Sequence, residues 1–113
     1  MFASAPELLI GWTTATTADE ARALATGLVE AGLAACVQID SPITSVYRWQ
    51  ERTETAPEHR LSIKFLPVHR AAVEAWIRDH HPYDTPEWVV VRAEHVSEKY
   101  LSWARANSSS PPL

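Results

Sequence analysis

The apolar residues of this 113-residue chain change their spacing along the sequence in an order that permits few folds. Four segments have the length and composition of β-strands, and two segments between them have the spacing of amphipathic helices. The strand-like segments are Leu8–Thr13, Leu33–Trp49, His59–Phe65 and Trp88–Val91. One helical segment follows the first of these strands and the other follows the third, so the order is β-α-β-β-α-β.

This order predicts an α+β fold, a ferredoxin-like split β-α-β sandwich with both helices on one face of an antiparallel sheet. Thr17 and Glu20 fit a capping box at the start of the first helix, and Gly32 fits a left-handed cap after its end. Pro67 suits the first turn of the second helix. Ser97 is the expected N-cap of an extra C-terminal helix.

Three segments carry less regular signals. Pro42 predicts a bulge or bend at a sheet edge, because proline cannot donate to a strand ladder. The polar stretch Gln50–Glu58 contains Pro57 and is expected to be a turn or the frayed tip of a long hairpin. The continuous apolar run Trp88–Val91 is typical of a strand that is buried on both faces.

The length allows one domain, expected over residues 1–106, with a polar tail over residues 107–113. A single cysteine, Cys36, excludes a disulfide-held scaffold. The net charge of −4 and the lack of a basic cluster argue against nucleic-acid binding. No apolar run approaches about 18 residues, and the first seven residues lack the features of a signal peptide. We therefore expect a cytoplasmic protein that contacts no membrane.

Catalysis has little support in the sequence. The three glycines are too far apart for a phosphate-binding loop or a dinucleotide fingerprint. No serine has the context of a nucleophile elbow, and no pair of carboxylates is identifiable by spacing. We therefore expect a protein that is not an enzyme.

Five tryptophans are many for so small a core, and two helices can cover only one face of the sheet. The other face of the sheet would then expose a large apolar patch, and such patches usually mark interfaces. We therefore expect a homo-oligomer with Tyr47, Trp49 and Trp88 at the subunit boundary. The alternative is a monomer whose last helix folds across the open face of the sheet.

Several motifs, in order along the chain, resemble the CutA divalent-cation tolerance family. They are Gly-Leu-Ala-Ala-Cys-Val (32–37), Ile-Thr-Ser-Val-Tyr-Arg-Trp (43–49), Ser-Ile-Lys (62–64), His-His-Pro-Tyr-Asp-Thr-Pro-Glu (80–87) and Tyr-Leu-Ser-Trp (100–103). The resemblance implies a tight homotrimer similar to the PII signalling proteins. It also implies a role in tolerance to copper and other divalent cations, with no enzymatic reaction.

His80 and His81 are the candidate metal ligands, because imidazole suits copper and zinc. The resemblance implies copper at this pair together with a cysteine at the end of the first strand, where this chain has Thr13. Adjacent side chains at a helix end diverge by about 100°, so one chain is poorly suited to chelate with both. The alternative is that His80 is solvated and His81 is a hydrogen-bonded structural residue. No cofactor is expected to be required, and a divalent ion is the expected ligand.

A second candidate site is a cleft between subunits. Its candidate residues combine a cation, an acid, a thiol and aromatic walls, which would suit a small anionic or polar ligand. They are Cys36, Trp49, Lys64, Tyr83 and Glu87. The sequence therefore leaves two functions open: weak binding of divalent metal at an intersubunit site, or a PII-like scaffold that binds a small ligand or a partner protein without a dedicated metal.

Overall fold

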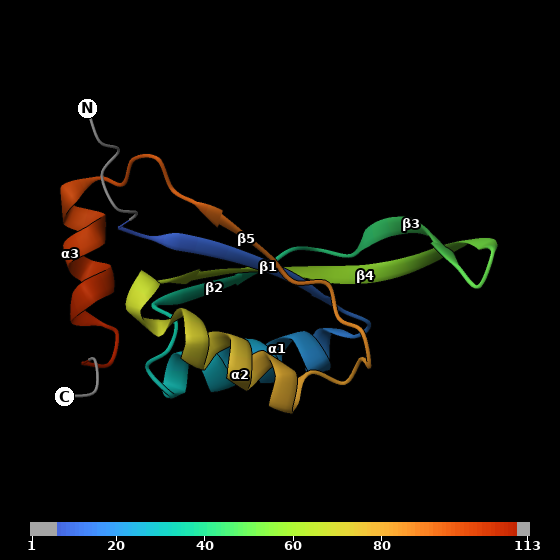
Figure 1. Ribbon diagram of the computed structural model, residues 1–113, viewed down its shortest axis with the longest axis horizontal. Coiled ribbons are helices and arrows are strands. Elements are labelled where there is room, and N and C mark those ends of the chain that lie inside the picture. The colour runs from blue at the N-terminus through green and yellow to red at the C-terminus, as the bar shows by residue number, and fades with distance from the viewer. Residues whose placement is uncertain (1–6, 111–113) are drawn as a thin grey trace.

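A computed structural model describes residues 7–110, which form one antiparallel sheet with two helices on one face and a third across one end (Figure 1). The strands are β1 (Leu9–Ala15), β2 (Cys36–Ile39), β3 (Ile43–Trp49), β4 (Arg52–Phe65) and β5 (Val89–Arg92). The order across the sheet is β2-β4-β1-β5, and β3 pairs with the remaining half of β4. The helices are α1 (Ala18–Glu30), α2 (Arg70–His80) and α3 (Glu98–Ala106), with a short 3-10 turn, η1 (Pro67–His69), before α2.

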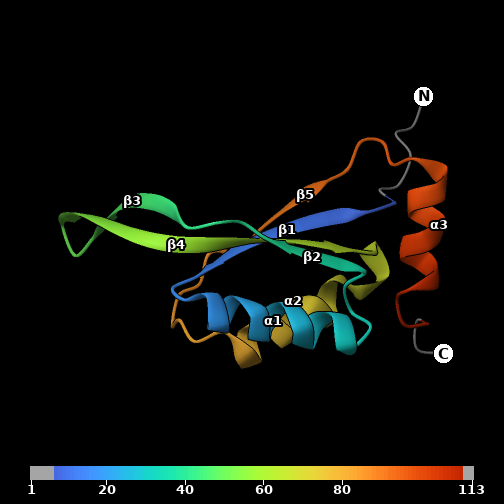
Figure 2. The same cartoon turned by 180° about the vertical axis from the view of Figure 1, so that it is seen from behind.

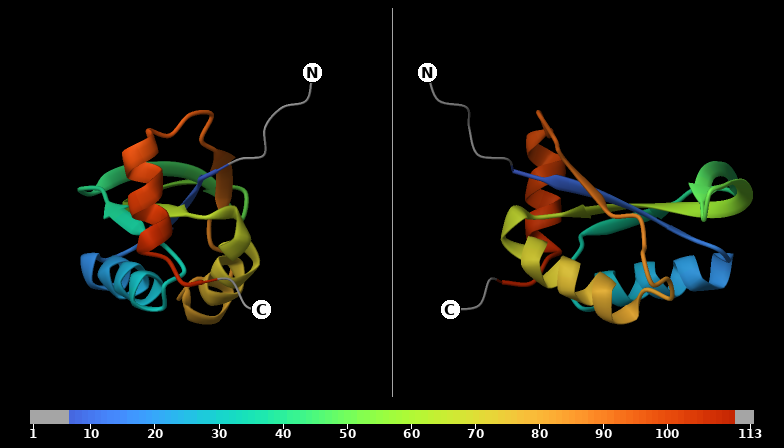
Figure 3. Two further views of the ribbon diagram at one scale, coloured as in Figure 1. Left: turned by 90° about the vertical axis from the view of Figure 1, so that its left-hand side faces the viewer. Right: turned by 45° about the vertical axis from the view of Figure 1, so that its right-hand side comes forward.

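This architecture confirms the predicted α+β fold. Helices α1 and α2 lie side by side under the same face of the sheet, and α3 crosses the sheet at one end (Figures 2 and 3). The Thr17 side chain accepts a hydrogen bond from the Glu20 backbone at 3.1 Å, and Gly32 has a φ of +72° just after α1. Both helix boundaries of α1 are therefore set by local residues, as the sequence predicts.

The main core lies between the sheet and helices α1 and α2. Leu61, Ile63 and Phe65 alternate along β4 and are fully buried on this face. They pack against Leu28 of α1 and Val73 of α2. The opposite face of the sheet carries no helix except α3 at its end (Figure 1).

The segment Gln50–Glu58 lies at the tip of a long hairpin, which is one of the two predicted alternatives, but its strands are paired up to the turn and the tip is not frayed. The turn consists of Gln50 and Glu51 alone, and β4 begins at Arg52 and runs through Pro57, which lies opposite Thr44. Proline is tolerated here because this half of β4 has only one neighbouring strand. The β3–β4 hairpin therefore projects well beyond the helices (Figure 1).

The hairpin turn contains two residues with left-handed backbone, Gln50 at φ +50° and Glu51 at φ +66°. This conformation costs a residue with a side chain about 1–2 kcal/mol relative to its preferred regions. Glu51→Gly is therefore expected to raise the free energy of unfolding by about 1 kcal/mol in urea titrations. Glu54→Gly, in the same hairpin but inside the strand, is the matched control and is expected to destabilise. A stability loss in Glu51→Gly would contradict the assigned turn.

The last strand also differs from the prediction. Strand β5 is an edge strand, and Val89 is 48% exposed, so within this chain the strand is not buried on both faces. Trp88 precedes the strand and lies over Gly11, with its ring 6.2 Å from that of Phe65. Its indole N–H donates to Glu74 at 2.9 Å. The partly buried Trp88 side chain thus packs against the core of its own chain, and its position at a subunit boundary stays a prediction.

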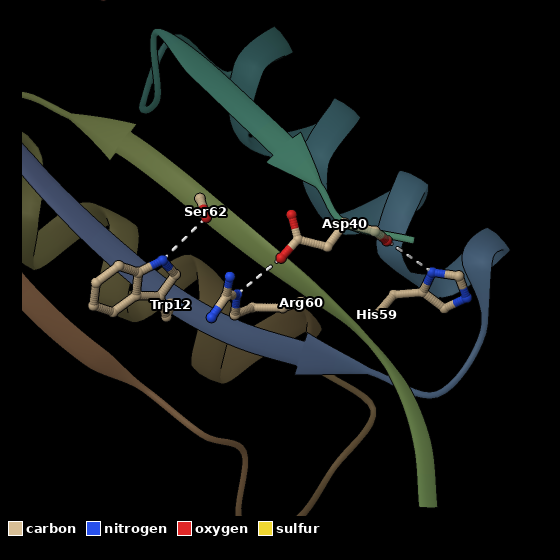
Figure 4. A network of polar contacts seen from close by, with 5 residues as sticks. All are labelled: Trp12, Asp40, His59, Arg60 and Ser62. Carbon is tan, nitrogen blue, oxygen red and sulfur yellow. Dashed lines mark hydrogen bonds and ion pairs between the residues drawn. The ribbon is translucent and has the colours of Figure 1, made fainter. Parts of the chain in front are cut away.

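The linker between β2 and β3 is fixed by Asp40 (Figure 4). Its backbone N–H donates to the carbonyl of Arg60 at 2.9 Å, and its carboxylate accepts from the Arg60 side chain at 2.9 Å. Its carbonyl accepts a hydrogen bond from Nδ1 of His59 at 3.2 Å. Pro42 lies between the end of β2 and the start of β3, where the sequence predicts a bend. Asp40 turns the chain from the sheet into the projecting hairpin.

The described part of the tail is attached to the domain. The Ser109 backbone N–H donates to the carbonyl of Gly32 at 2.8 Å, and its hydroxyl donates to the carbonyl of Ala31 at 3.2 Å. The ends of the predicted domain and tail, residues 1–6 and 111–113, lie outside the described residues. Within residues 7–110, no helix is long and apolar enough to cross a membrane. The cytoplasmic location stays a prediction.

Candidate metal centre

The two adjacent histidines lie at the end of α2 but belong to different local structures. His80 is the last helical residue, and His81 is the C-cap with extended backbone at φ −72° and ψ 133°. The backbone N–H of His81 still donates to the carbonyl of Ile77 at 2.8 Å. The two side chains therefore have different surroundings: that of His80 is exposed and that of His81 is buried.

His81 is a buried structural residue in which both ring nitrogens are used. Nε2 lies 2.9 Å from the carbonyl oxygen of Thr14, which can only accept, so Nε2 carries the proton. Nδ1 lies 3.1 Å from the backbone N–H of Tyr83, which can only donate, so Nδ1 is the acceptor. The hydroxyl of Thr13 is also within 3.1 Å of Nε2. The neutral ring thus has no free lone pair for a metal ion.

Tyr83 continues this polar network to β4. Its hydroxyl donates to the Glu58 carboxylate at 3.1 Å and lies 2.5 Å from the hydroxyl of Thr16. Burial raises the pKa of the Tyr83 phenol above its ordinary value, so the phenol stays a donor at neutral pH. The network ties the segment after α2 to the end of β1 and to the base of the hairpin.

His80 is exposed, and its ring is oriented by Trp76, one helical turn earlier. Nδ1 lies 2.8 Å from the backbone carbonyl of Trp76, so it carries the proton and donates. The two rings stack with centroids 3.9 Å apart and planes 15° apart. Within residues 7–110, Nε2 of His80 has no hydrogen-bond partner, and this tautomer leaves its lone pair available. Metal-binding histidines commonly donate their other ring N–H to a carbonyl in this way.

The donor set of one chain is small. Among the described residues, no group of three or more His, Cys, Asp or Glu side chains could hold a metal ion. Thr13, which stands where the resemblance implies a cysteine, is fully buried, and its hydroxyl faces His81. Within residues 7–110 of one chain, His80 is thus the one imidazole of this pair with an open nitrogen, and a divalent ion bound there would need its other ligands from outside the chain.

Within residues 7–110 of one chain, the predicted cleft residues are spread out, and only Cys36 and Lys64 are neighbours. Lys64 pairs with Cys36 across the sheet, and its ammonium group lies 5.5 Å from the ring centre of Tyr100 in α3. Tyr83 contacts β4 at Glu58, and Trp49 pairs with β4 at Arg52. These three positions on β4, residues 64, 58 and 52, are six residues apart, and each interval spans about 20 Å. Glu87 is exposed on the segment before β5. A cleft that combines these side chains therefore requires more than one subunit and stays a prediction.

Two of the residues expected at a subunit boundary, Tyr47 and Trp49, are exposed on the hairpin, and so is Val46 beside them. Val46 is 66% exposed, Trp49 56% and Tyr47 44%. Val89 and Trp103 are also exposed, on β5 and α3. A surface of this kind is unusual for a monomer and is typical of a protein–protein contact.

The burial of His81 predicts a pH dependence of stability. Burial lowers its pKa below the ordinary value of 6.5, so the unfolded chain binds this proton more readily than the folded chain. The contribution of His81 to the free energy of unfolding is therefore fully present above pH 6.5 and decreases as the pH falls below that value. NMR titration of the ring resonances is expected to place the pKa of His81 below 6.5. A pKa at or above this value would contradict the buried, neutral assignment.

Comparison with known proteins places the chain among close relatives. A model of the CutA1 divalent ion tolerance protein family matches residues 9–107, which include every element from β1 to α3. The divalent-cation tolerance protein CutA of Citrobacter koseri is 34% identical over 104 residues, 92% of this chain and 90% of that protein.

Solved structures show the same similarity. CutA1 of a psychrotrophic Shewanella species has a TM-score of 0.89 at 37% identity, covering 95% of this chain and 100% of that chain. CutA of Synechococcus elongatus, solved in complex with a Bis-Tris molecule, has a TM-score of 0.83 at 38% identity. It covers 91% of this chain and 95% of that chain. The fold described above is therefore that of experimentally determined structures.

Proposed function

The chain belongs to the CutA1 divalent ion tolerance family, and from this premise we propose that it acts in divalent-cation tolerance as a homotrimer that binds metal ions weakly through His80. The observation that carries the proposal is the orientation of His80. Its Nδ1 proton is committed to the Trp76 carbonyl, and its exposed Nε2 keeps a lone pair. His81 is excluded from the ligand set by its own hydrogen bonds.

One imidazole per chain accounts for weak binding. Neutral imidazole is a good ligand for copper and zinc, but a stable zinc site has about four ligands. The missing ligands would come from a neighbouring subunit or from solvent. Replacement of a thiolate by Thr13 removes the soft ligand that favours copper, so we propose a site with modest preference between the two ions.

The open sheet face and the hairpin support self-association. Closed symmetry is the usual form of homo-oligomers, and the family resemblance favours three subunits. Sedimentation at micromolar concentration should give a species of three chains of 12.6 kDa each. A species of one chain would contradict the assembly.

The metal site is tested by calorimetric titration with Cu²⁺ and Zn²⁺. His80→Ala is expected to weaken binding at least tenfold, because it removes the one imidazole with an open nitrogen. His95→Ala removes another exposed histidine, far along the chain from α2, and is the matched control that should bind like the wild type. Equal binding by His80→Ala and the wild type would exclude His80 as a ligand.

A second candidate function is a scaffold that binds a small ligand without a dedicated metal. Two observations favour it: a relative that was solved with a Bis-Tris molecule, and the Lys64 ammonium group over the Tyr100 ring. This function predicts ligand binding that survives a chelator and is lost in Lys64→Met. Binding abolished by the chelator would favour the metal site instead.

A further inference from the structure

We infer that Trp76 is a positioning residue for metal binding at His80, holding the imidazole so that Nε2 faces away from the helix and strengthening the bond to a cation. This inference rests on the proposed function, since it assigns a second residue to the same site. Its basis is a stack of two rings on one face of α2, at positions 76 and 80.

The indole of Trp76 is itself fixed by the neighbouring helix. Gly27 of α1 lies directly against it, and a Cβ added at Gly27 would come within 2.3 Å of the Trp76 ring. A glycine inside a helix costs about 0.5–1 kcal/mol relative to alanine, so this close approach gives the glycine a packing role. Trp76 also packs against the main core. The ring that supports His80 therefore has little freedom to move.

Trp76 holds the imidazole in two ways. Its backbone carbonyl accepts the Nδ1 proton at 2.8 Å, which selects the tautomer with a bare Nε2. Its indole face lies parallel to the imidazole at 3.9 Å, which restricts the rotation of the His80 side chain. A ligand whose rotamer and tautomer are already selected loses less entropy when it binds an ion.

The stack also has an electronic effect. An imidazole that binds a divalent ion takes on positive charge, and an indole face attracts a cation more strongly than other aromatic side chains do. At exposed sites this attraction corresponds to about a two- to fivefold change in affinity. The same stack gives little advantage to the neutral ring, so the gain appears as tighter metal binding.

The experiment compares Trp76→Leu with Trp76→Phe in Zn²⁺ and Cu²⁺ titrations at pH 8, where ordinary imidazoles are neutral. Trp76→Leu is expected to bind about two- to fivefold more weakly than the wild type, while Trp76→Phe retains an aromatic face and most of the affinity. Both variants leave a gap beside Gly27, so a loss caused only by looser packing would be similar in the two. Equal affinity of the leucine variant and the wild type would overturn the inference.

A spectroscopic readout separates this role from a structural one. Bound Cu²⁺ in contact with the stack is expected to quench the fluorescence of Trp76, and the quenched component should be missing from Trp76→Phe. Quenching unchanged in Trp76→Phe would overturn the inference. His80→Ala separates the two proposals: if it binds like the wild type, the metal site itself fails. If it loses binding while Trp76→Leu does not, only the role of Trp76 fails.

Discussion

His81→Ala is expected to lower the free energy of unfolding by about 3 kcal/mol, measured by urea titration at pH 7.5 and fixed chain concentration. The substitution leaves the carbonyl of Thr14 and the N–H of Tyr83 without their partner. It also removes a side chain that is only 9% exposed at the junction of α2 and β1. An unsatisfied buried polar group costs about 1–3 kcal/mol, and two such groups dominate the effect.

The adjacent His80→Ala is the matched control, because it lies on the same helix end. It loses one hydrogen bond to a backbone carbonyl that is already part of the helix, so a loss under about 1 kcal/mol is expected. The two substitutions are thus expected to affect two different measurements. His81→Ala should affect stability far more than His80→Ala, and His80→Ala should affect metal binding. Equal destabilisation by both substitutions would contradict this division.

Gly11→Ala is expected to cost about 2 kcal/mol, although it adds only a methyl group. The new Cβ would lie 2.4 Å from the ring of Trp88, so the indole must move. Movement of the indole breaks its bond to Glu74 and disturbs its contact with Phe65. The Trp88 bond also lowers the pKa of the Glu74 carboxyl, so the indole leaves an ionised partner behind.

A double-mutant cycle tests whether this cost comes from Trp88. In a Trp88→Leu background the ring is absent, and Gly11→Ala is expected to cost less than about 0.5 kcal/mol or to stabilise the strand slightly. A cost that is unchanged in this background would place the clash elsewhere. This contact explains why a glycine lies in the middle of β1 opposite Val90.

Local patterns were sufficient for most of the fold. Helix α1 begins after Thr17 and ends before Gly32 because these residues act on the backbone beside them, and such effects are readable from sequence. The sequence predicts a long hairpin but not how far its two strands pair, because that signal is not local. The charged residues around Pro57 resemble a loop, and only pairing with Ile43–Trp49 makes them a strand.

The residue types of the candidate site were predictable, and so was, as one of two alternatives, the structural role of His81; its hydrogen-bond partners were not. The sequence identifies His80 and His81 as a pair, but it does not show that His81 bonds to Thr14, a residue 67 positions earlier. The supporting role of Trp76 was also missed, although its spacing of four residues from His80 in a predicted helix was the available signal. Likewise, the pairing of Cys36 with Lys64 depends on strand register, which no local motif specifies.

A crystal structure of the zinc-loaded protein, with anomalous scattering used to locate the ion, tests the division of the histidine pair most directly. The predicted result is zinc at about 2.0–2.1 Å from Nε2 of His80, with further ligands from a neighbouring subunit or water. His81 should keep its hydrogen bonds to Thr14 and Tyr83. Zinc bound to His81, with those bonds broken, would contradict the assignment of the site.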